Sequence, residues 1–191
     1  VLHSQAAQML DVAYADGTSF QVLREPARAP GKKNEAYCLR GGSPGKEVTL
    51  YEYNAYSDKE FLTDFFDGFE GTVHTDAENV FHTVAALPKV QLSLCHAHAR
   101  RKFEQVYTSA KKKDGLAKQA LRFWQALYAV ERDAKERNLA HAQVYELRQE
   151  KSVPLLTEFK VWMDQHSQTV LPKSPLGKAF AYSLKHWQGL C

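Results

Sequence analysis

The sequence predicts an α/β fold with a five-stranded mixed sheet in its first half and a helical bundle in its second half. Three observations support this prediction. Short segments that alternate apolar and polar residues recur through residues 11–95 and are rich in β-branched and aromatic side chains. Two segments with helical periodicity lie among them. From residue 96 onward, apolar side chains recur at helical spacing along nearly the whole chain.

The first three strands are predicted over residues 11–16, 35–40 and 47–53, where apolar and polar residues alternate. The turn-rich segment 24–34 separates the first two strands. The Gly- and Pro-containing segment 41–46 is typical of a hairpin connection between the next two. We therefore expect these three strands to form an antiparallel meander.

A helix is predicted next, over residues 58–69. Ser57 is expected to be its N-cap, with Glu60 three residues later as the partner in a capping box, and the helix should end near Gly68. One face of this helix is apolar and consists of Phe61, Leu62, Phe65 and Phe66. An apolar face of this kind is expected to pack on the sheet.

The remaining elements of the first half are a strand over 72–75, a helix over 77–87 and a strand over 90–95. The predicted elements follow one another in the order of the ribonuclease H-like fold: three strands, a helix, a strand, a helix and a strand. In this fold the later strands join the sheet through helical crossovers. The ends of its first and fourth strands lie side by side. Asp16 and Asp76 follow those two strand ends, so we expect their side chains to face each other across 60 residues of sequence.

The second half is predicted to be helical. Helices are expected over residues 97–112, from Leu116 onward, from Pro154 onward, and after a cap at Ser174 that is followed by Pro at the first helical position. Their apolar faces carry Leu116, Ala120, Phe123, Trp124, Leu127, Val130, Leu155, Phe159, Trp162, Met163, Leu176, Phe180, Leu184 and Trp187. We interpret these stripes as the core of a bundle, because aromatic stripes at helical spacing serve packing far more often than cofactor binding.

Composition narrows the class of protein. The chain has 191 residues, is 44% hydrophobic, and contains no apolar run long enough for a membrane span. Three widely spaced cysteines, Cys38, Cys95 and Cys191, argue against a disulfide framework and indicate a reducing compartment. Residues 1–95 hold 8 Lys and Arg against 13 Asp and Glu, whereas residues 96–191 hold 17 against 9. An acidic half beside a basic half fits a nucleic-acid enzyme, but from charge alone an ordinary Lys-rich helical surface is the favoured explanation of the basic half.

Asp16 and Asp76 are the candidate metal ligands. Carboxylates at neighbouring strand ends are suited to Mg²⁺ or Mn²⁺, which prefer oxygen ligands and support phosphoryl transfer. The competing interpretation is that Asp76 caps the helix that follows it, which is the commoner role for Asp before a helix.

The segment Cys-His-Ala-His-Ala-Arg-Arg-Lys-Phe, residues 95–103, is the second cluster with possible chemistry. We do not predict a zinc site from Cys95, His96 and His98, because the two histidines point to different faces of a helix and a second ligand pair is missing. The basic residues favour phosphate contacts or partners for the acids, with a solvated basic turn as the alternative. The predicted DNA contacts are His98, Arg100, Arg101 and Lys102.

The sequence resembles the insertion-sequence-66 family of bacterial DDE transposases. The matching segments are YADGTSFQVL (14–23), GTVHTDAENVF (71–81), CHAHARRKF (95–103), RQEKSVPLL (148–156) and LPKSPLGKAFAYSLKHWQGLC (171–191). The resemblance implies that Asp16 and Asp76 are the first two acids of the catalytic triad. It also implies that residues 1–95 are a ribonuclease H-like core and that residues 96–191 are a helical insertion.

The chain departs from the family's pattern in several places. Gly17 stands where the family usually has Glu, Ala77-Glu78 where it usually has Gly-Tyr, and His96 where it often has Trp. The family's catalytic Glu lies in an Asn-Asn-x-Ala-Glu-Arg segment beyond the last matching run. We therefore expect a fragment whose core is incomplete and lacks the final catalytic helix.

The expected function is that of a transposase fragment. Its parent would cut DNA at transposon ends with Mg²⁺ or Mn²⁺ and join those ends to target DNA. A homo-oligomer of the full-length protein is an expected partner, and the expected location is the bacterial cytoplasm at the nucleoid. The fragment should bind metal weakly and be inactive or nearly so. One alternative is a non-catalytic DNA-binding or interaction remnant of a decayed transposase. Another is a metal-dependent nuclease that uses an internal acid such as Glu131 or Glu150.

Overall fold

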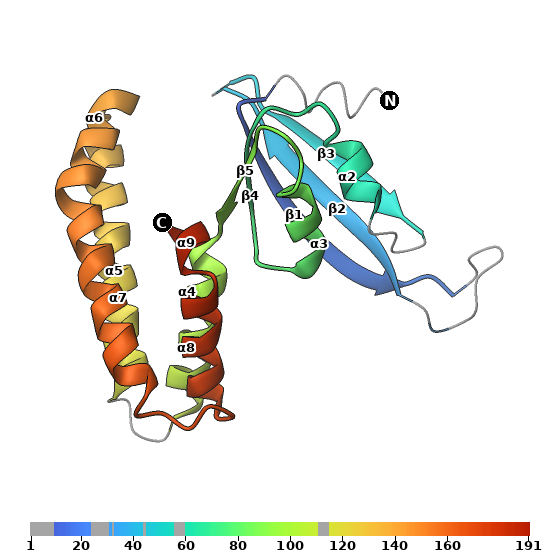
Figure 1. The fold of residues 1–191 in the computed structure, drawn as a ribbon. Coiled ribbons are helices and arrows are strands. Elements are labelled where there is room, and N and C mark those ends of the chain that lie inside the picture. The colour runs from blue at the N-terminus through green and yellow to red at the C-terminus, as the bar shows by residue number, and fades with distance from the viewer. Residues whose placement is uncertain (1–9, 24–30, 32, 44, 56–59, 111–114) are drawn as a thin grey trace. The chain divides into compact units, whose positions relative to one another are not determined.

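The computed structural model describes residues 10–23, 31, 33–43, 45–55, 60–110 and 115–191. The chain forms two compact units, Val1–Cys95 and His96–Cys191, and each is described here by itself. In its described residues the first unit contains strands and the helices α2 and α3, whereas the second unit consists of helices (Figure 1).

The first unit is built on a five-stranded mixed sheet with the strand order β3-β2-β1-β4-β5. β1 pairs antiparallel with β2, which pairs antiparallel with β3, while β4 runs parallel to both β1 and β5. The strands are β1 (Val12–Gln21), β2 (Lys33–Gly41), β3 (Val48–Asn54), β4 (Gly71–Thr75) and β5 (Val90–Leu94). This arrangement confirms the predicted α/β fold with the strand order of the ribonuclease H-like class.

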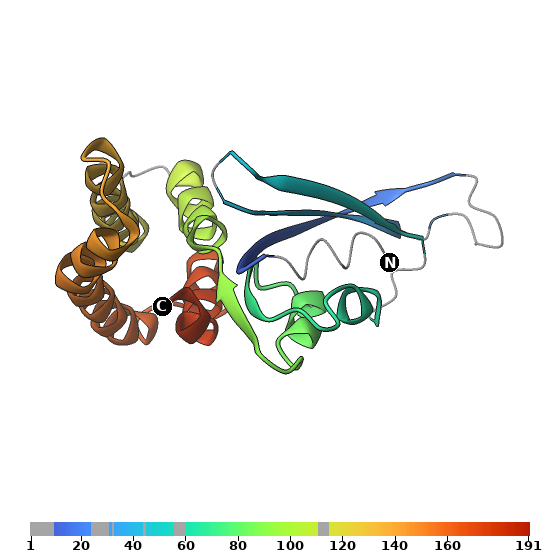
Figure 2. The ribbon, with the colours of Figure 1, turned by 90° about the horizontal axis from the view of Figure 1, so that it is seen from above.

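Helices α2 (Glu60–Phe65) and α3 (Asn79–Val84) pack on the same face of this sheet (Figure 2). Alternate residues of the strands meet the helices in one core, because successive side chains of a strand point to opposite faces. The core contains Ala13, Ala15, Tyr37, Leu39, Leu62, Phe65, Phe66, Phe69, Val73, Phe81 and Val84. Both helices are shorter than the predicted 58–69 and 77–87. The predicted cap at Ser57 lies outside the described residues.

Strand β1 is longer than predicted, and the expectation that it ends at Asp16 is wrong. The strand continues to Gln21 because its antiparallel pairing with β2 extends as far as Gln21 opposite Lys33. Its parallel pairing with β4, in contrast, stops at Tyr14 opposite His74. Asp16 therefore lies inside a strand but just beyond the part that β4 covers.

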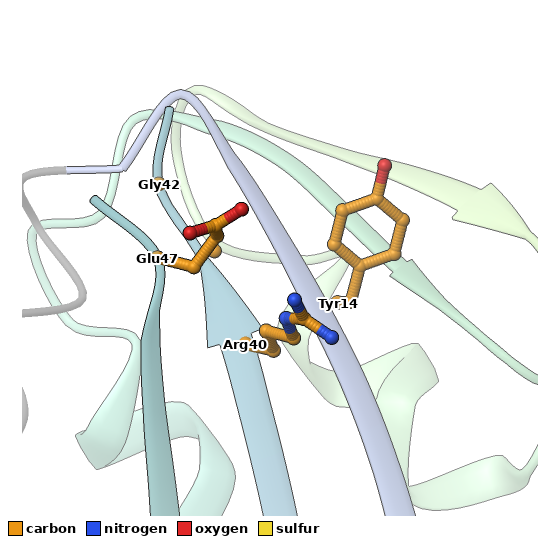
Figure 3. A pocket seen from close by; sticks show the side chains of 5 residues that line it. Tyr14, Arg40, Gly42 and Glu47 are labelled. Carbon is orange, nitrogen blue, oxygen red and sulfur yellow. The ribbon is translucent and has the colours of Figure 1, made fainter. Parts of the chain in front are cut away.

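The first unit also has a hollow of about 460 Å³ on its sheet (Figure 3). Tyr14 and Arg40, which are opposite each other on β1 and β2, line it together with Gly41, Gly42 and Glu47. Gly42 is required there because its φ is +108° and a Cβ would meet the carbonyl oxygen of residue 46 at 2.5 Å. The described lining residues include one cation, Arg40, and one acid, Glu47, so their charges favour neither anions nor cations.

The second unit is a helical bundle, in which α4 packs on α5 and α8, and α7 packs on the same two helices. Its helices are α4 (His96–Ser109), α5 (Leu116–Glu136), α6 (His141–Leu147), α7 (Val153–Ser167), α8 (Pro175–Lys185) and α9 (Trp187–Leu190). A π-helical turn, η1 (Arg148–Ser152), joins α6 to α7. No helix in the described ranges is both long and apolar enough to span a membrane.

Aromatic side chains fill the core of the bundle, as the helical spacing predicted. Phe103 lies with its ring centroid 5.3 Å from those of both Trp124 and Phe180, and Phe159 lies 4.8 Å from Trp124. The predicted cap at Ser174 is confirmed, because its Oγ accepts a hydrogen bond from the backbone N–H of Gly177 at 3.0 Å. Helix α6 and the π-helical turn were not predicted.

Candidate active site

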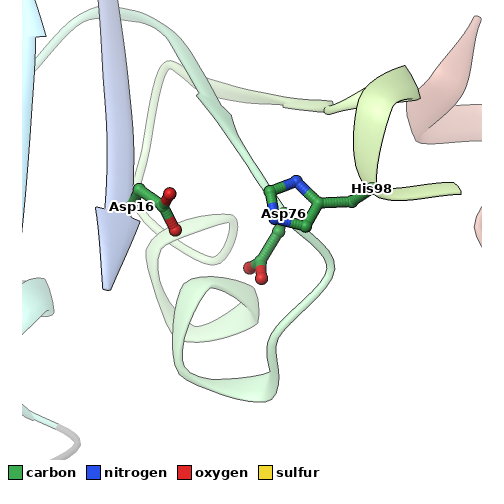
Figure 4. Close-up of side chains that lie close together, drawn as sticks. All are labelled: Asp16, Asp76 and His98. Atoms are coloured by element: carbon green, nitrogen blue, oxygen red, sulfur yellow. The ribbon is translucent and has the colours of Figure 1, made fainter. Parts of the chain in front are cut away.

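Asp16 and Asp76 come together in the first unit through the register of two parallel strands. Tyr14 of β1 is opposite His74 of β4, and each acid lies two residues further along its own segment. Residues two apart on neighbouring parallel strands keep the same side-chain direction and advance together. A carboxylate oxygen of Asp16 consequently lies within 4.8 Å of one of Asp76 (Figure 4).

Each carboxylate is held by one backbone hydrogen bond. Oδ1 of Asp16 accepts from the N–H of Gly17 at 3.0 Å, and Oδ1 of Asp76 accepts from the N–H of Glu78 at 3.0 Å. The second bond is an Asx-type turn that leads into α3, whose first residue is Asn79. Glu78 is the N-cap residue of α3, so Asp76 bonds to the backbone of the N-cap and is not itself the cap.

The acid pair fits a divalent cation. Among the described residues, no Lys or Arg forms an ion pair with Asp16 or Asp76. Two carboxylates this close repel each other, and a cation between them removes that repulsion. Carboxylate oxygens are the ligands that Mg²⁺ and Mn²⁺ prefer. Two acids supply only part of a coordination shell, which leaves room for water and for substrate oxygens.

Hydrogen bonds join β4 and β5 at their carboxyl ends, next to Asp76. The backbone N–H of Cys95 donates to the carbonyl oxygen of Thr75 at 2.7 Å. One residue earlier along β4, Nδ1 of His74 lies 3.1 Å from Oγ of Ser93 on β5. These contacts hold the end of β4 against β5, so the position of Asp76 follows from the sheet and not from a free loop.

Gly17, one of the departures from the family's pattern, lies beside Asp16 and against a buried ring. A Cβ at this position would meet the Tyr37 ring at 3.0 Å, which is closer than most real Cβ contacts. Burial, together with the Glu35 carboxylate that accepts its hydroxyl hydrogen bond, raises the pKa of Tyr37 far above the usual value. A Glu at position 17 would therefore require the Tyr37 ring to shift slightly.

The predicted basic cluster begins helix α4 in the second unit, and its members have different surroundings. Arg100 donates to both carboxylate oxygens of Glu104, at 2.7 and 3.1 Å. Arg101 is exposed. Lys102 lies with Nζ 4.2 Å from the centroid of the Tyr182 ring. The three side chains therefore do not form one uniform basic turn.

Figure 4 also labels His98, whose helix belongs to the second unit, so the acid pair is the part that the first unit builds alone.

His96, which follows the last strand, takes part in the bundle core. The indole N–H of Trp124 donates to its Nδ1 at 3.2 Å, and its Nε2 lies 2.6 Å from the carbonyl oxygen of Leu190. Because Nδ1 accepts, Nε2 carries the proton and donates to that carbonyl. The imidazole thus links the start of α4 to α5 and to α9.

The internal acids considered as alternative catalytic residues lie on helices of the second unit. Glu131 accepts two hydrogen bonds from Arg148, at 2.8 and 2.7 Å, and these bonds lower the pKa of Glu131 below its ordinary value. Glu150 is exposed in the π-helical turn. The ion pair engages both oxygens of Glu131, which weakens the case for it as a metal ligand.

A sequence model of the family described as "Transposase IS66 family" matches residues 3–191, nearly the whole chain. This match confirms the resemblance seen in the sequence.

Two proteins of Sinorhizobium fredii are similar over most of the chain. Uncharacterized protein y4hP is 29% identical over 154 residues, which cover 72% of this chain and 27% of that protein. Uncharacterized protein y4jD is 27% identical over 128 residues, which cover 64% of this chain and 24% of that protein. The matched region is therefore about a quarter of the length of each relative.

Proposed function

Because the chain belongs to the IS66 transposase family, we propose that its sheet unit carries two acids of a metal-dependent site for phosphoryl transfer on DNA. The observation that supports this proposal is the acid pair. The carboxylates of Asp16 and Asp76 approach within 4.8 Å from two parallel neighbouring strands, without an ion-pair partner in the described part of the chain.

The two units have different roles in this proposal. Residues 1–95 are the ribonuclease H-like core that positions the acids, and residues 96–191 are a helical insertion. The third acid of the triad would come from the family's Asn-Asn-x-Ala-Glu-Arg segment, and the 191 residues contain no Asn-Asn pair. The whole protein would cut transposon ends and join them to target DNA.

Asp16 and Asp76 would bind Mg²⁺ or Mn²⁺ through the oxygens that face each other. When bound, the ion would act as a Lewis acid on the phosphate and favour ionisation of a water or a DNA 3′-hydroxyl. The chain's own contribution is positional: the backbone N–H groups of Gly17 and Glu78 keep the two carboxylates in place. Because the carboxylates are already in position before the reaction, the protein does not have to reorganise them during it.

The basic start of α4 would contact DNA phosphates. We propose Arg101 and Lys102 as the stronger contacts, because neither has a carboxylate bonded to it in the described structure, and Arg100 as a weaker one because Glu104 offsets its charge. His98 remains a proposed DNA contact on the same helix.

A second candidate function is a non-catalytic DNA-binding remnant. One observation favours it: among the described residues of the first unit, no third carboxylate joins Asp16 and Asp76. The two candidates differ in their metal dependence, since a remnant would bind DNA without using the acid pair.

Manganese binding tests the acid pair directly. Titration of the 191-residue chain with Mn²⁺ in a calorimeter should give weak binding, and either Asp16→Asn or Asp76→Asn should abolish it. Asp64→Asn is the matched control, because Asp64 is an exposed acid on α2 in the same unit. Binding that survives both site substitutions, or that Asp64→Asn also removes, would contradict the proposed metal site.

Strand cleavage tests the catalytic part of the proposal. The 191-residue chain with Mn²⁺ should not cut a duplex that carries the end sequence of the element, because one acid is missing. A longer family chain that continues through the Asn-Asn-x-Ala-Glu-Arg segment should cut it, and Asp76→Asn in that chain should prevent cutting. Cleavage by the 191-residue chain, lost on Asp76→Asn, would mean that an acid within these residues completes the site.

A further inference from the structure

A groove of about 590 Å³ runs between helices α4 and α8 in the second unit. Both helices are labelled in Figure 1, and they pack directly on each other. The groove is lined by Lys102, Gln105, Val106 and Ser109 of α4 and by Pro175, Lys178, Ala179 and Tyr182 of α8. The pairing of early α4 residues with late α8 residues indicates that the two helices run antiparallel along it.

The charge of the groove has one sign. Among the described residues that line the groove, Lys102 and Lys178 are the charged ones, and none is acidic. The two helices that form the groove also carry an excess of positive charge. Together α4 and α8 have five Lys and Arg residues and one acid, Glu104, which is bonded to Arg100. An anionic partner is therefore favoured at this surface.

The Tyr182 ring holds one of these cations in place. Nζ of Lys102 lies 4.2 Å from the ring centroid, a cation–π contact that limits the freedom of the ammonium group. Lys102 and Tyr182 are both half-buried, whereas Lys178, Gln105 and Ser109 are exposed. The groove thus combines a pre-positioned ammonium with exposed polar groups able to donate hydrogen bonds to phosphate and sugar oxygens.

The N-terminal end of the groove on α8 is rigid. Ser174 caps α8 by accepting from the N–H of Gly177, and a Cβ on Gly177 would meet the carbonyl oxygen of Leu171 at 2.2 Å. The close contact between the preceding loop and the helix fixes the position from which Lys178 extends. Both cations are therefore carried by well-anchored helices, which lowers the entropy lost on binding.

We propose that the α4–α8 groove binds the phosphate backbone of DNA, with Lys102 and Lys178 as its two phosphate contacts. The proposal rests on the proposed function in taking DNA as the partner and Lys102 as one of its contacts, and it extends that contact to α8; neither acid of the proposed metal site lines the groove. The exposed lining residues Gln105, Ser109 and Lys178 carry polar groups that suit phosphate and sugar oxygens, which favours DNA over an acidic peptide.

The test measures binding of a fluorescent duplex by anisotropy, with EDTA present, over a series of salt concentrations. The variant is Lys102→Gln with Lys178→Gln in the 191-residue chain. The matched control is Lys135→Gln with Lys151→Gln, which removes the same charge from two exposed lysines of the same unit. Circular dichroism and the unfolding temperature check that both double variants are folded.

The groove variant should bind DNA at least tenfold more weakly near 0.1 M salt, and its salt slope should fall by about 2, because each lost phosphate contact removes roughly 0.9 from that slope. The control should lose less than threefold. Equal losses in both double variants would assign the effect to net charge and overturn the proposal, as would an unchanged affinity in the groove variant. Unchanged DNA binding together with altered self-association would also overturn it and would make the groove a protein contact.

The same assay separates this proposal from the metal site. Asp16→Asn combined with Asp76→Asn should leave DNA binding in EDTA unchanged, since neither acid lines the groove. If the groove variant loses binding while Mn²⁺ titration finds no site at the acids, the groove stands and the proposed metal site fails. If Mn²⁺ binds at the acids while the groove variant keeps its affinity for DNA, the proposed metal site stands and the groove proposal fails.

Discussion

Removing one charge of the acid pair should stabilise the first unit when no divalent ion is present. Asn at position 16 or 76 keeps a side-chain oxygen in place of Oδ1, so the hydrogen bonds from Gly17 and Glu78 are retained and only the charge is lost. The repulsion between the two carboxylates is therefore the main quantity that either substitution changes.

The expected size follows from the separation of the two oxygens. The oxygens lie no more than 4.8 Å apart, so Coulomb's law gives at least about 0.9 kcal/mol at the dielectric constant of water and at least about 3.5 kcal/mol at an effective value near 20. Because Asp16 is exposed and Asp76 half-buried, we expect a value near the lower limit, about 1 kcal/mol, in low salt at neutral pH. High salt should reduce it, since screening shortens the range of exposed charges.

The assay is urea unfolding in EDTA, with two probes for the two units. All three tryptophans, Trp124, Trp162 and Trp187, lie in the second unit, so their fluorescence is an internal control that should not change. Circular dichroism also reports the sheet unit, and its transition should move to higher urea in Asp16→Asn and in Asp76→Asn.

A double-mutant cycle decides whether the two acids interact. Either single substitution removes the repulsion, so the double variant should gain about the same 1 kcal/mol as each single variant and not twice that amount. Additive gains, or losses of stability in both single variants, would refute the interpretation that these carboxylates are close and unpaired. Addition of Mn²⁺ should stabilise the natural chain more than any of the variants.

Three further predictions concern single contacts. His96→Ala should destabilise the second unit by about 1–3 kcal/mol in urea unfolding followed by tryptophan fluorescence, because it leaves the indole N–H of Trp124 without its acceptor; a change below a few tenths would contradict the hydrogen-bonded role. Glu131→Gln should cost about 0.5 kcal/mol near neutral pH, since the pair with Arg148 is half exposed. The pKa of Glu131 is lowered in the folded chain, so this difference should be complete above the ordinary pKa of 4.5 and disappear as the pH falls through the lowered value; a difference that persists in strong acid would have another origin. Gly177→Ala should lower the unfolding temperature, because the added Cβ meets backbone oxygen at 2.2 Å, and an unchanged temperature would show that the preceding loop moves freely.

The sequence by itself determined the fold class and the pairing of the two acids. Alternation of apolar and polar residues is a local property, and it identified five strands within two residues of their observed bounds, except for the end of β1. The order of strands and helices then restricted the topology, because crossover connections place later strands beside the first. Asp16 and Asp76 could be paired from that order without any knowledge of their contacts.

Local spacing could also have supplied one detail that the sequence prediction missed. Arg100 and Glu104 are four residues apart on a helix, a spacing at which opposite charges meet, so the weaker role of Arg100 was readable from the sequence. The extension of β1 beyond Asp16 was not, because it depends on pairing with a strand that begins at Lys33.

The tertiary structure alone decided what surrounds the remaining functional side chains. Lys102 and Tyr182 are 80 residues apart, and His96 is 94 residues from Leu190, yet each pair is in contact. Periodicity identifies which face of a helix is apolar but not which helix packs against it, since many pairings bury a similar apolar area. The α4–α8 groove and the tautomer of His96 therefore became visible only once the helices of the bundle were placed together.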